Sequence, residues 1–236
     1  QMYKSCEHFN LQKEEIFIQK VIQLYDTICV RHGLMIVGPS GGGKTSNLKT
    51  LQHTLSSLAG EGDFQKVNTT IMNPKSITMG QLYGEVDPQT TEWIDGVLAK
   101  KIEICAADES PEKHWVVFDG PVDSLWIESM NTVLDDNKKL CLNSGQIIPL
   151  TDRMTMMFEV EDLEVASPAT VSRCGMVYME PQALGTDCIF QSWYNTFPPP
   201  FKLSDKLSQK IKDYVSKYIG ELQRFVRKEL YEPVVT

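Results

Sequence analysis

The feature that most constrains this chain is a glycine-rich segment between an apolar run and a helical pattern. Residues 38–45 read Gly-Pro-Ser-Gly-Gly-Gly-Lys-Thr and match G-x-x-x-x-G-K-[ST] in full. The apolar run at residues 34–37 precedes the segment, and a helical pattern at residues 45–58 follows it. Because this motif is meaningful only between a strand and a helix, the context favours a phosphate-binding loop in an α/β fold.

The residue types of the loop suit the binding of phosphate. Glycines permit positive φ, so successive backbone N–H groups can turn toward one anion, and the following helix points the positive end of its dipole there. We expect Lys44 to reach the β- and γ-phosphates and Thr45 to ligate Mg²⁺. A glycine-rich turn that binds nothing is the less favoured alternative. The predicted binding residues are Gly38, Pro39, Ser40, Gly41, Gly42, Gly43, Lys44, Thr45 and Ser46.

The remaining pattern predicts the layers of the fold. Parallel neighbouring strands need a crossover that a helix normally supplies, so alternating strands and helices predict a five-stranded parallel sheet with flanking helices. A hairpin that turns at residues 143–145 is expected as an insertion within residues 140–148. The other expected strands are residues 70–72, 115–118, 154–160 and 175–179, and the other expected helices are residues 13–30, 80–105 with interruptions, 124–136 and 169–173.

A second, smaller unit is expected at the C-terminal end. After the proline-rich segment 197–200, apolar residues recur at three- and four-residue spacing between residues 203 and 226, which predicts a long amphipathic helix or a helix pair. We therefore divide the chain into residues 1–181, a large α/β domain, and residues 182–236, a small helical domain.

Composition narrows the classes of partner. The formal net charge of −8 disfavours a nucleic-acid-binding protein, which needs a basic surface to bind the phosphates of the nucleic acid. No apolar run approaches the roughly 20 residues of a membrane helix, and the first residues do not resemble a secretory signal. Six cysteines without a C-x-x-C pair and four histidines without ligand spacing indicate reduced thiols and no zinc site. We expect an intracellular protein with neither a nucleic-acid nor a membrane partner.

An acid at the end of another expected strand would complete the phosphate site. Asp119 follows the apolar run 115–118 and would hold Mg²⁺ through its water shell; an aspartate that caps a turn is the alternative. Many ring-forming P-loop ATPases carry Glu at the next position to polarise the attacking water, but here the residue is Gly120. Asp123 and Glu128, the next acids, are weak substitutes. Losing such a group costs about 10²–10⁴-fold in rate, so we expect ATP binding with slow hydrolysis, if any.

Several long segments resemble one family. They are similar to the second AAA+ module of the dynein heavy chain motor ring, and residues 121 and 140–148 look more like axonemal than cytoplasmic dyneins. The resemblance implies an AAA+ fold in a six-module ring within one long polypeptide, with the adjacent modules as partners and with microtubules bound by other parts of the parent protein. It implies a location in the cytoskeleton and the axoneme of a cilium or flagellum. The segments are residues 73–86, 93–96, 115–123, 133–140, 158–160 and 167–175.

The resemblance also implies roles for single residues. In this family the second module holds ATP, or ADP, as a structural ligand while the first module performs the main hydrolysis. The strand at residues 154–160 should offer a polar sensor to the γ-phosphate, usually Asn, but Glu159 occupies that place, and a carboxylate repels phosphate unless a cation intervenes. Arg173 stands where such ATPases carry an arginine finger for the neighbouring module. An arginine paired with an acid at a strand edge is the alternative. Residues 9–11 resemble the segment near adenine.

Two other functions remain open at this point. One is an autonomous P-loop ATPase that uses Asp123 or Glu128 to activate water. The other is a purely structural module of the ring interface, in which the nucleotide pocket is empty.

Overall fold

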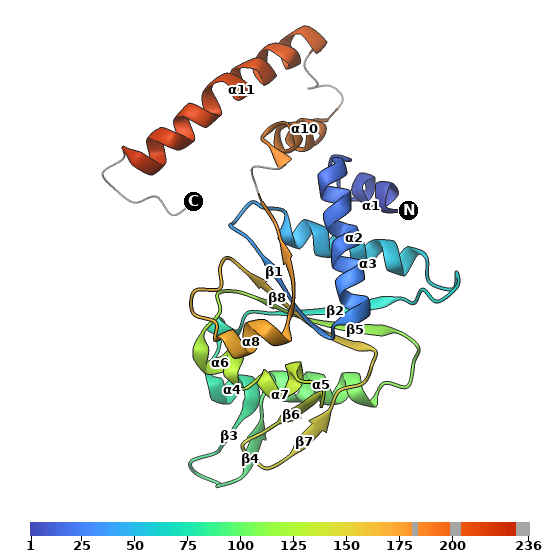
Figure 1. The fold of residues 1–236 in the computed structure, drawn as a ribbon, viewed down its shortest axis with the longest axis vertical. Coiled ribbons are helices and arrows are strands. Elements are labelled where there is room, and N and C mark those ends of the chain that lie inside the picture. Colours follow the sequence, from blue (N-terminus) through green and yellow to red (C-terminus); the bar gives the residue numbers. More distant parts are fainter. Residues whose placement is uncertain (181–183, 199–203, 230–236) are drawn as a thin grey trace.

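The computed structural model describes residues 1–180, 184–198 and 204–229, and a five-stranded parallel sheet lies at its centre (Figure 1). The strand order is β2-β5-β8-β1-β9, and each pair of neighbours is parallel. All five predicted strands are present, which confirms the predicted sheet. They are β1 (Gly33–Val37), β2 (Val67–Met72), β5 (Lys113–Asp119), β8 (Met154–Val160) and β9 (Gly175–Tyr178).

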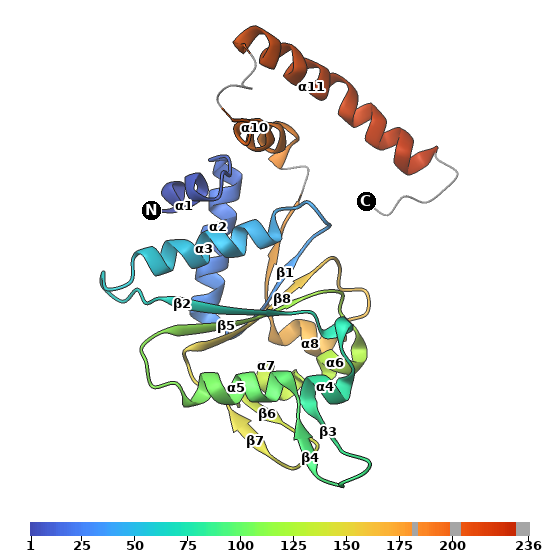
Figure 2. The same cartoon turned by 180° about the vertical axis from the view of Figure 1, so that it is seen from behind.

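Helices cover both faces of this sheet (Figures 1 and 2). Strand β1 shows how the sequence produces this arrangement. Leu34 and Ile36 belong to one apolar cluster and Met35 and Val37 to the other, so the strand is buried on both faces. One face carries α1 (Met2–His8), α2 (Glu15–Val30) and α3 (Lys44–Ser57); the other carries α4 (Met79–Tyr83), α5 (Val97–Ala107), α6 (Ser124–Glu128), α7 (Asn131–Leu134) and α8 (Pro168–Arg173).

Two of the predicted helices differ from the structure. The interruption within residues 80–105 is a β-hairpin, β3 (Gly84–Val86) paired with β4 (Trp93–Asp95), between α4 and α5. Strands of three residues are too short to show an alternating pattern, which is why the sequence did not predict them. The expected helix at residues 124–136 is two short helices, α6 and α7, separated by a turn at residues 129–130.

The second hairpin agrees with the prediction. Strand β6 (Lys139–Cys141) pairs antiparallel with β7 (Ile147–Pro149), and Gly145 in the turn has a φ of 89°. A glycine adopts this conformation without strain. Both hairpins lie at the end of the molecule opposite α10 and α11 (Figure 1).

The C-terminal part is helical. It contains α10 (Asp187–Asn195), which the sequence analysis did not identify, and α11 (Asp205–Lys228), which extends away from the sheet (Figure 1). Of the two predicted arrangements, the single long helix is the correct one within residues 204–229. The predicted boundary between residues 181 and 182 and the prolines at 199 and 200 lie outside the described residues. Within the described part of the chain, no helix combines the length and apolarity needed to span a bilayer.

Candidate nucleotide site

The glycine-rich loop lies at the carboxyl edge of the sheet, between β1 and α3. Gly41 and Gly43 have φ values of 80° and 83°, in the left-handed region that glycine favours, and α3 begins at Lys44, one residue before the predicted start. A Cβ on Gly38 would lie 2.2 Å from the backbone oxygen of Met179, so only glycine fits there. The sequence therefore folds locally into the turn that a phosphate-binding loop requires.

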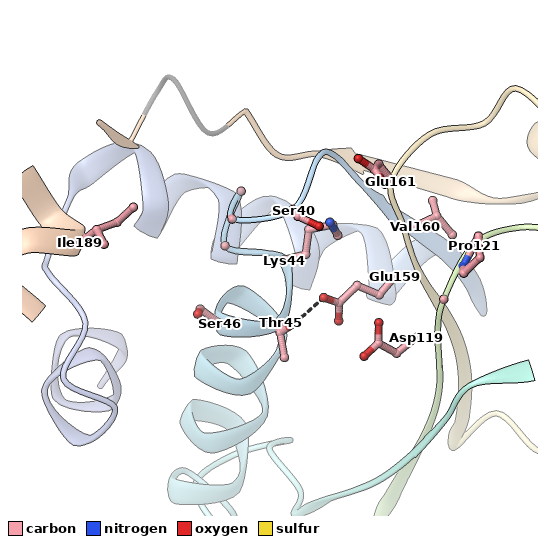
Figure 3. A pocket seen from close by; sticks show the side chains of 14 residues that line it. Ser40, Lys44, Thr45, Ser46, Asp119, Pro121, Glu159, Val160, Glu161 and Ile189 are labelled. Atoms are coloured by element: carbon pink, nitrogen blue, oxygen red, sulfur yellow. Dashed lines mark hydrogen bonds between the residues drawn. The ribbon is translucent and has the colours of Figure 1, made fainter. Parts of the chain in front are cut away.

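A cavity of about 660 Å³ opens beside this loop (Figure 3). Parallel strands bring their carboxyl ends to one edge of a sheet, and ligands bind at that edge in folds of this type. The loop residues predicted to bind phosphate, from Ser40 to Ser46, line the cavity together with Asp119 and Glu159. The remaining lining residues are Gly120, Pro121, Val160, Glu161 and Ile189.

The ammonium group of Lys44 lies folded against its own loop. Its Nζ donates hydrogen bonds to the backbone oxygens of Gly38, at 2.5 Å, and of Pro39, at 3.2 Å. The cation is thus held by carbonyl groups of the loop itself. Phosphate oxygens are stronger, charged acceptors for an ammonium group than peptide carbonyls.

Thr45, Asp119 and Glu159 face one another across the cavity (Figure 3). Asp119 ends β5 and is exposed, and it is the register partner of Glu159 on β8. Glu159 is buried, and its Oε1 accepts a hydrogen bond from the Thr45 hydroxyl. Burial raises the pKa of Glu159; the bond from Thr45 acts against this shift, and the Asp119 charge adds to it.

The donor set of this cluster fits Mg²⁺. Hydroxyl and carboxylate oxygens are its preferred protein ligands, and it commonly takes only one or two carboxylates together with phosphate oxygens. Among the described residues, no group of three or more His, Cys, Asp or Glu side chains could hold a metal ion by itself. A magnesium ion here would therefore be shared between Thr45, the nearby carboxylates and the phosphates of a nucleotide.

The position after Asp119 carries no acid, and the two substitute acids lie elsewhere. Asp123 caps α6 by accepting from the backbone N–H of Leu125 at 2.8 Å, and it forms a 2.7 Å ion pair with Lys75. That bond from Lys75, followed by the one from Leu125, lowers the pKa of Asp123. Glu128 is exposed on α6, and neither acid lines the cavity.

Glu161 is a cavity residue that the sequence analysis did not single out. It is exposed and follows the end of β8, two residues after Glu159. Its closeness to the carboxyl end of a predicted central strand was the available signal. Ile189, on the unpredicted helix α10, had no such signal.

A second cavity of about 450 Å³ adjoins the first one. The two share Gly41, Gly43, Ser46 and Ile189. Residues 9–12, Phe17 and residues of α10 form much of its wall, which is mainly apolar. Residues 9–11, predicted to lie near adenine, therefore lie in a cavity whose character suits a flat, largely apolar ring.

Arg173 lies outside both cavities, at the end of α8. Its Nε donates to Asp135, and its Nη1 donates to the backbone oxygen of Ala169 at 2.7 Å. The side chain is 33% exposed. The pairing with an acid that was the alternative interpretation is present here, and the predicted role toward a neighbouring module remains a prediction.

Comparisons with known proteins match this chain to one family of proteins. Residues 33–174 match the family model described as AAA domain (dynein-related subfamily), and residues 1–45 match the model described as hydrolytic ATP binding site of dynein motor region. The chain is 50% identical to dynein axonemal heavy chain 1 of Homo sapiens over 238 residues, or 99% of this chain. It is 53% identical to dynein axonemal heavy chain 12 of Rattus norvegicus over 200 residues, or 84% of this chain. The chain spans about 6% of the length of each of these relatives.

Proposed function

The chain belongs to the dynein-related AAA family, and from that membership we propose that it is the second AAA+ module of an axonemal dynein heavy chain, which binds Mg-ATP with little or no hydrolysis. Gly120 is the observation that carries this proposal. It stands where a water-polarising acid would be needed, while the loop, Lys44, Thr45 and Asp119 are all in place around one cavity. The site is thus equipped to hold a nucleotide but lacks a general base at the expected position.

Each part of the site has a separate task in binding. The N–H groups of the loop and Lys44 hold the phosphates, Thr45 and Asp119 hold Mg²⁺, and the apolar cavity beside residues 9–11 receives the base. Bound Mg²⁺ neutralises phosphate charge and fixes the orientation of the phosphates. Because ADP offers the same base and β-phosphate contacts, the pocket accepts it as well.

Arg173 would act outside its own module. It lies away from the cavities of this chain and is partly exposed, so it is available to a neighbour once it leaves Asp135. We assign it the role of an arginine finger that stabilises transition-state charge in the adjacent catalytic module of the same heavy chain. The parent protein would bind microtubules through other segments and work in the axoneme; the names of the relatives describe those proteins as axonemal.

A titration followed by an assay on one sample tests this function. Mg-ATP is titrated into the purified chain by calorimetry, and phosphate release from the same sample is then followed for hours. We expect binding without appreciable release, and Lys44→Ala should abolish the binding. Release at ordinary ATPase rates, about 1 s⁻¹ or faster, would refute the absence of hydrolysis.

One observation favours a second candidate, the autonomous ATPase. Glu161 lines the cavity and is exposed, so it is a better placed substitute base than Asp123 or Glu128. If release occurs and Glu161→Gln removes it without weakening ATP binding, this second function is the correct one. A purely structural module would instead show no rise in melting temperature with Mg-ATP, whereas saturation at 100 Kd stabilises the fold by about 2.7 kcal/mol.

A further inference from the structure

The phosphate end of the cavity carries an excess of negative charge. Of the described residues that line it, Lys44 is basic, whereas Asp119, Glu159 and Glu161 are acidic. The Lys44 ammonium is moreover held by two carbonyl groups of its own loop. A nucleoside triphosphate without a metal ion would bring further negative charge to these carboxylates, so its entry is opposed by repulsion.

Glu159 differs from the other two acids in its burial and in its partner. It is 7% exposed, whereas Asp119 and Glu161 are both exposed. Its Oε1 accepts the hydrogen of the Thr45 hydroxyl. A hydroxyl has one hydrogen to donate and two lone pairs, so this bond leaves the lone pairs of Thr45 free for another ligand.

We infer that Glu159 is a positioning residue that fixes the Thr45 hydroxyl with its lone pairs toward a nucleotide-bound Mg²⁺, and that it makes the site selective for Mg-nucleotide over metal-free nucleotide. The inference rests on the proposed function, because it assumes that this cavity takes a nucleotide. It deepens that function by naming the form of the ligand that the site accepts.

An amide at position 159 would behave differently from the carboxylate. A glutamine oxygen would hold the Thr45 hydroxyl less firmly than a charged carboxylate does, and the NH₂ group would donate to a phosphate instead of repelling it. Removing the carboxylate therefore strengthens the binding of metal-free ATP and weakens the binding of Mg-ATP. Glu161→Gln removes the same unit of charge from the same cavity without touching Thr45, and it serves as the matched control.

The test measures two dissociation constants for each protein. The full 236-residue chain and its Glu159→Gln and Glu161→Gln variants are titrated with ATP by calorimetry, once with excess Mg²⁺ and once with EDTA. We expect the ratio of the metal-free to the Mg-ATP constant to fall by about tenfold or more in Glu159→Gln, and by less than about threefold in Glu161→Gln. A merely structural role of Glu159 would change both constants together and leave the ratio unchanged.

A further variant separates orientation from charge. Thr45→Val removes the hydroxyl but keeps a similar side-chain shape, and in that background Glu159→Gln should weaken Mg-ATP binding no further. If Glu159→Gln and Glu161→Gln lower the ratio equally, only net charge matters and the positioning role is refuted. An unchanged ratio in Glu159→Gln refutes the selectivity. The loss of all nucleotide binding in the parent chain, under both conditions, would instead refute the proposed function on which the inference rests.

Discussion

At the scale of the residue, the surroundings of Gly120 decide what a substitution there can achieve. A Cβ on Gly120 would lie 2.9 Å from the Oδ1 atom of Asn73, at the end of the neighbouring strand β2. The same Oδ1 accepts a hydrogen bond from the backbone N–H of Lys75 and caps a short 3₁₀ turn, residues Pro74–Ser76. The side chain of Asn73 therefore occupies the place that a larger residue 120 would need first.

This crowding predicts that an acid introduced at position 120 by itself will do little to speed ATP hydrolysis. We expect Gly120→Glu to raise phosphate release only slightly, because the new side chain and Asn73 compete for the same space. Combining it with Asn73→Ala should raise release by about 10²-fold over the parent chain, the lower end of what a positioned base contributes. Phosphate release at saturating Mg-ATP measures both. Asn73→Ala alone is the control and should release no more than the parent chain; equal rates for the single and double variants would contradict the competition.

At the scale of the element, long buried strands and the loop were predictable, whereas short irregular segments were not. The run at residues 34–37 is apolar throughout because β1 is buried on both faces, and the motif after it needs only local glycine geometry. The hairpin of β3 and β4 depends instead on tertiary packing, as Trp93 lies against the core cluster and its indole N–H donates to Asp95. The local sequence pattern does not encode such tertiary contacts.

The packing of α1 on α3 predicts a dependence of stability on pH. His53 of α3 stacks on His8 of α1 with ring centroids 4.4 Å apart, and its Nδ1 lies 3.0 Å from the Ser5 hydroxyl. Burial lowers the pKa of His53 below its ordinary value of 6.5, and the neighbouring His8 lowers it further. The unfolded chain therefore takes up this proton at a higher pH than the folded chain does. The stabilising contribution is complete above the unfolded pKa and is lost as the pH falls below it.

Urea unfolding at about pH 7 and about pH 5.5 measures this effect. The free energy of unfolding should fall between these values in the parent chain and fall less in His53→Gln. His8→Gln should remove a smaller part of the dependence, because His8 is the lesser cause of the shift. An identical decline in the parent chain and in His53→Gln would show that other groups are responsible.

At the scale of the whole molecule, the nucleotide pocket joins parts of the chain that are far apart in sequence. The second cavity, which we propose receives the base, lies between the segment after α1 and the helix α10, nearly 180 residues later. Asn10 connects the two: its Nδ2 donates to the backbone oxygen of Ser192 at 2.7 Å, and its Oδ1 accepts from Asn195 at 3.0 Å. This residue has a φ of 54°, a conformation that asparagine tolerates better than most residues.

Replacing Asn10 should therefore weaken nucleotide binding, although this residue does not line the phosphate end of the pocket. Asn10→Gly keeps the backbone conformation and removes both hydrogen bonds, and we expect a loss of about fivefold in affinity for Mg-ATP, the scale of one hydrogen bond's net contribution. Asn10→Ala adds backbone strain and should lose more. Calorimetry measures both, and Gln209→Ala is the control, because Gln209 is exposed on α11 and lines neither cavity. Wild-type affinity in Asn10→Gly would show that α10 does not form the base cavity in solution.

The position of β1 between β8 and β9 sets the order in which a growing polypeptide can complete this site. Until the ribosome has made β8 and β9, the apolar strand Gly33–Val37 has neither of its neighbours, and the backbone bonds from Gly38 to Val160 and from Met179 to Val37 do not yet exist. Chaperones therefore have a long interval in which to hold an exposed apolar strand. Nucleotide can be captured only after β8 and β9 have been made, when its arrival stabilises the most non-local part of the fold.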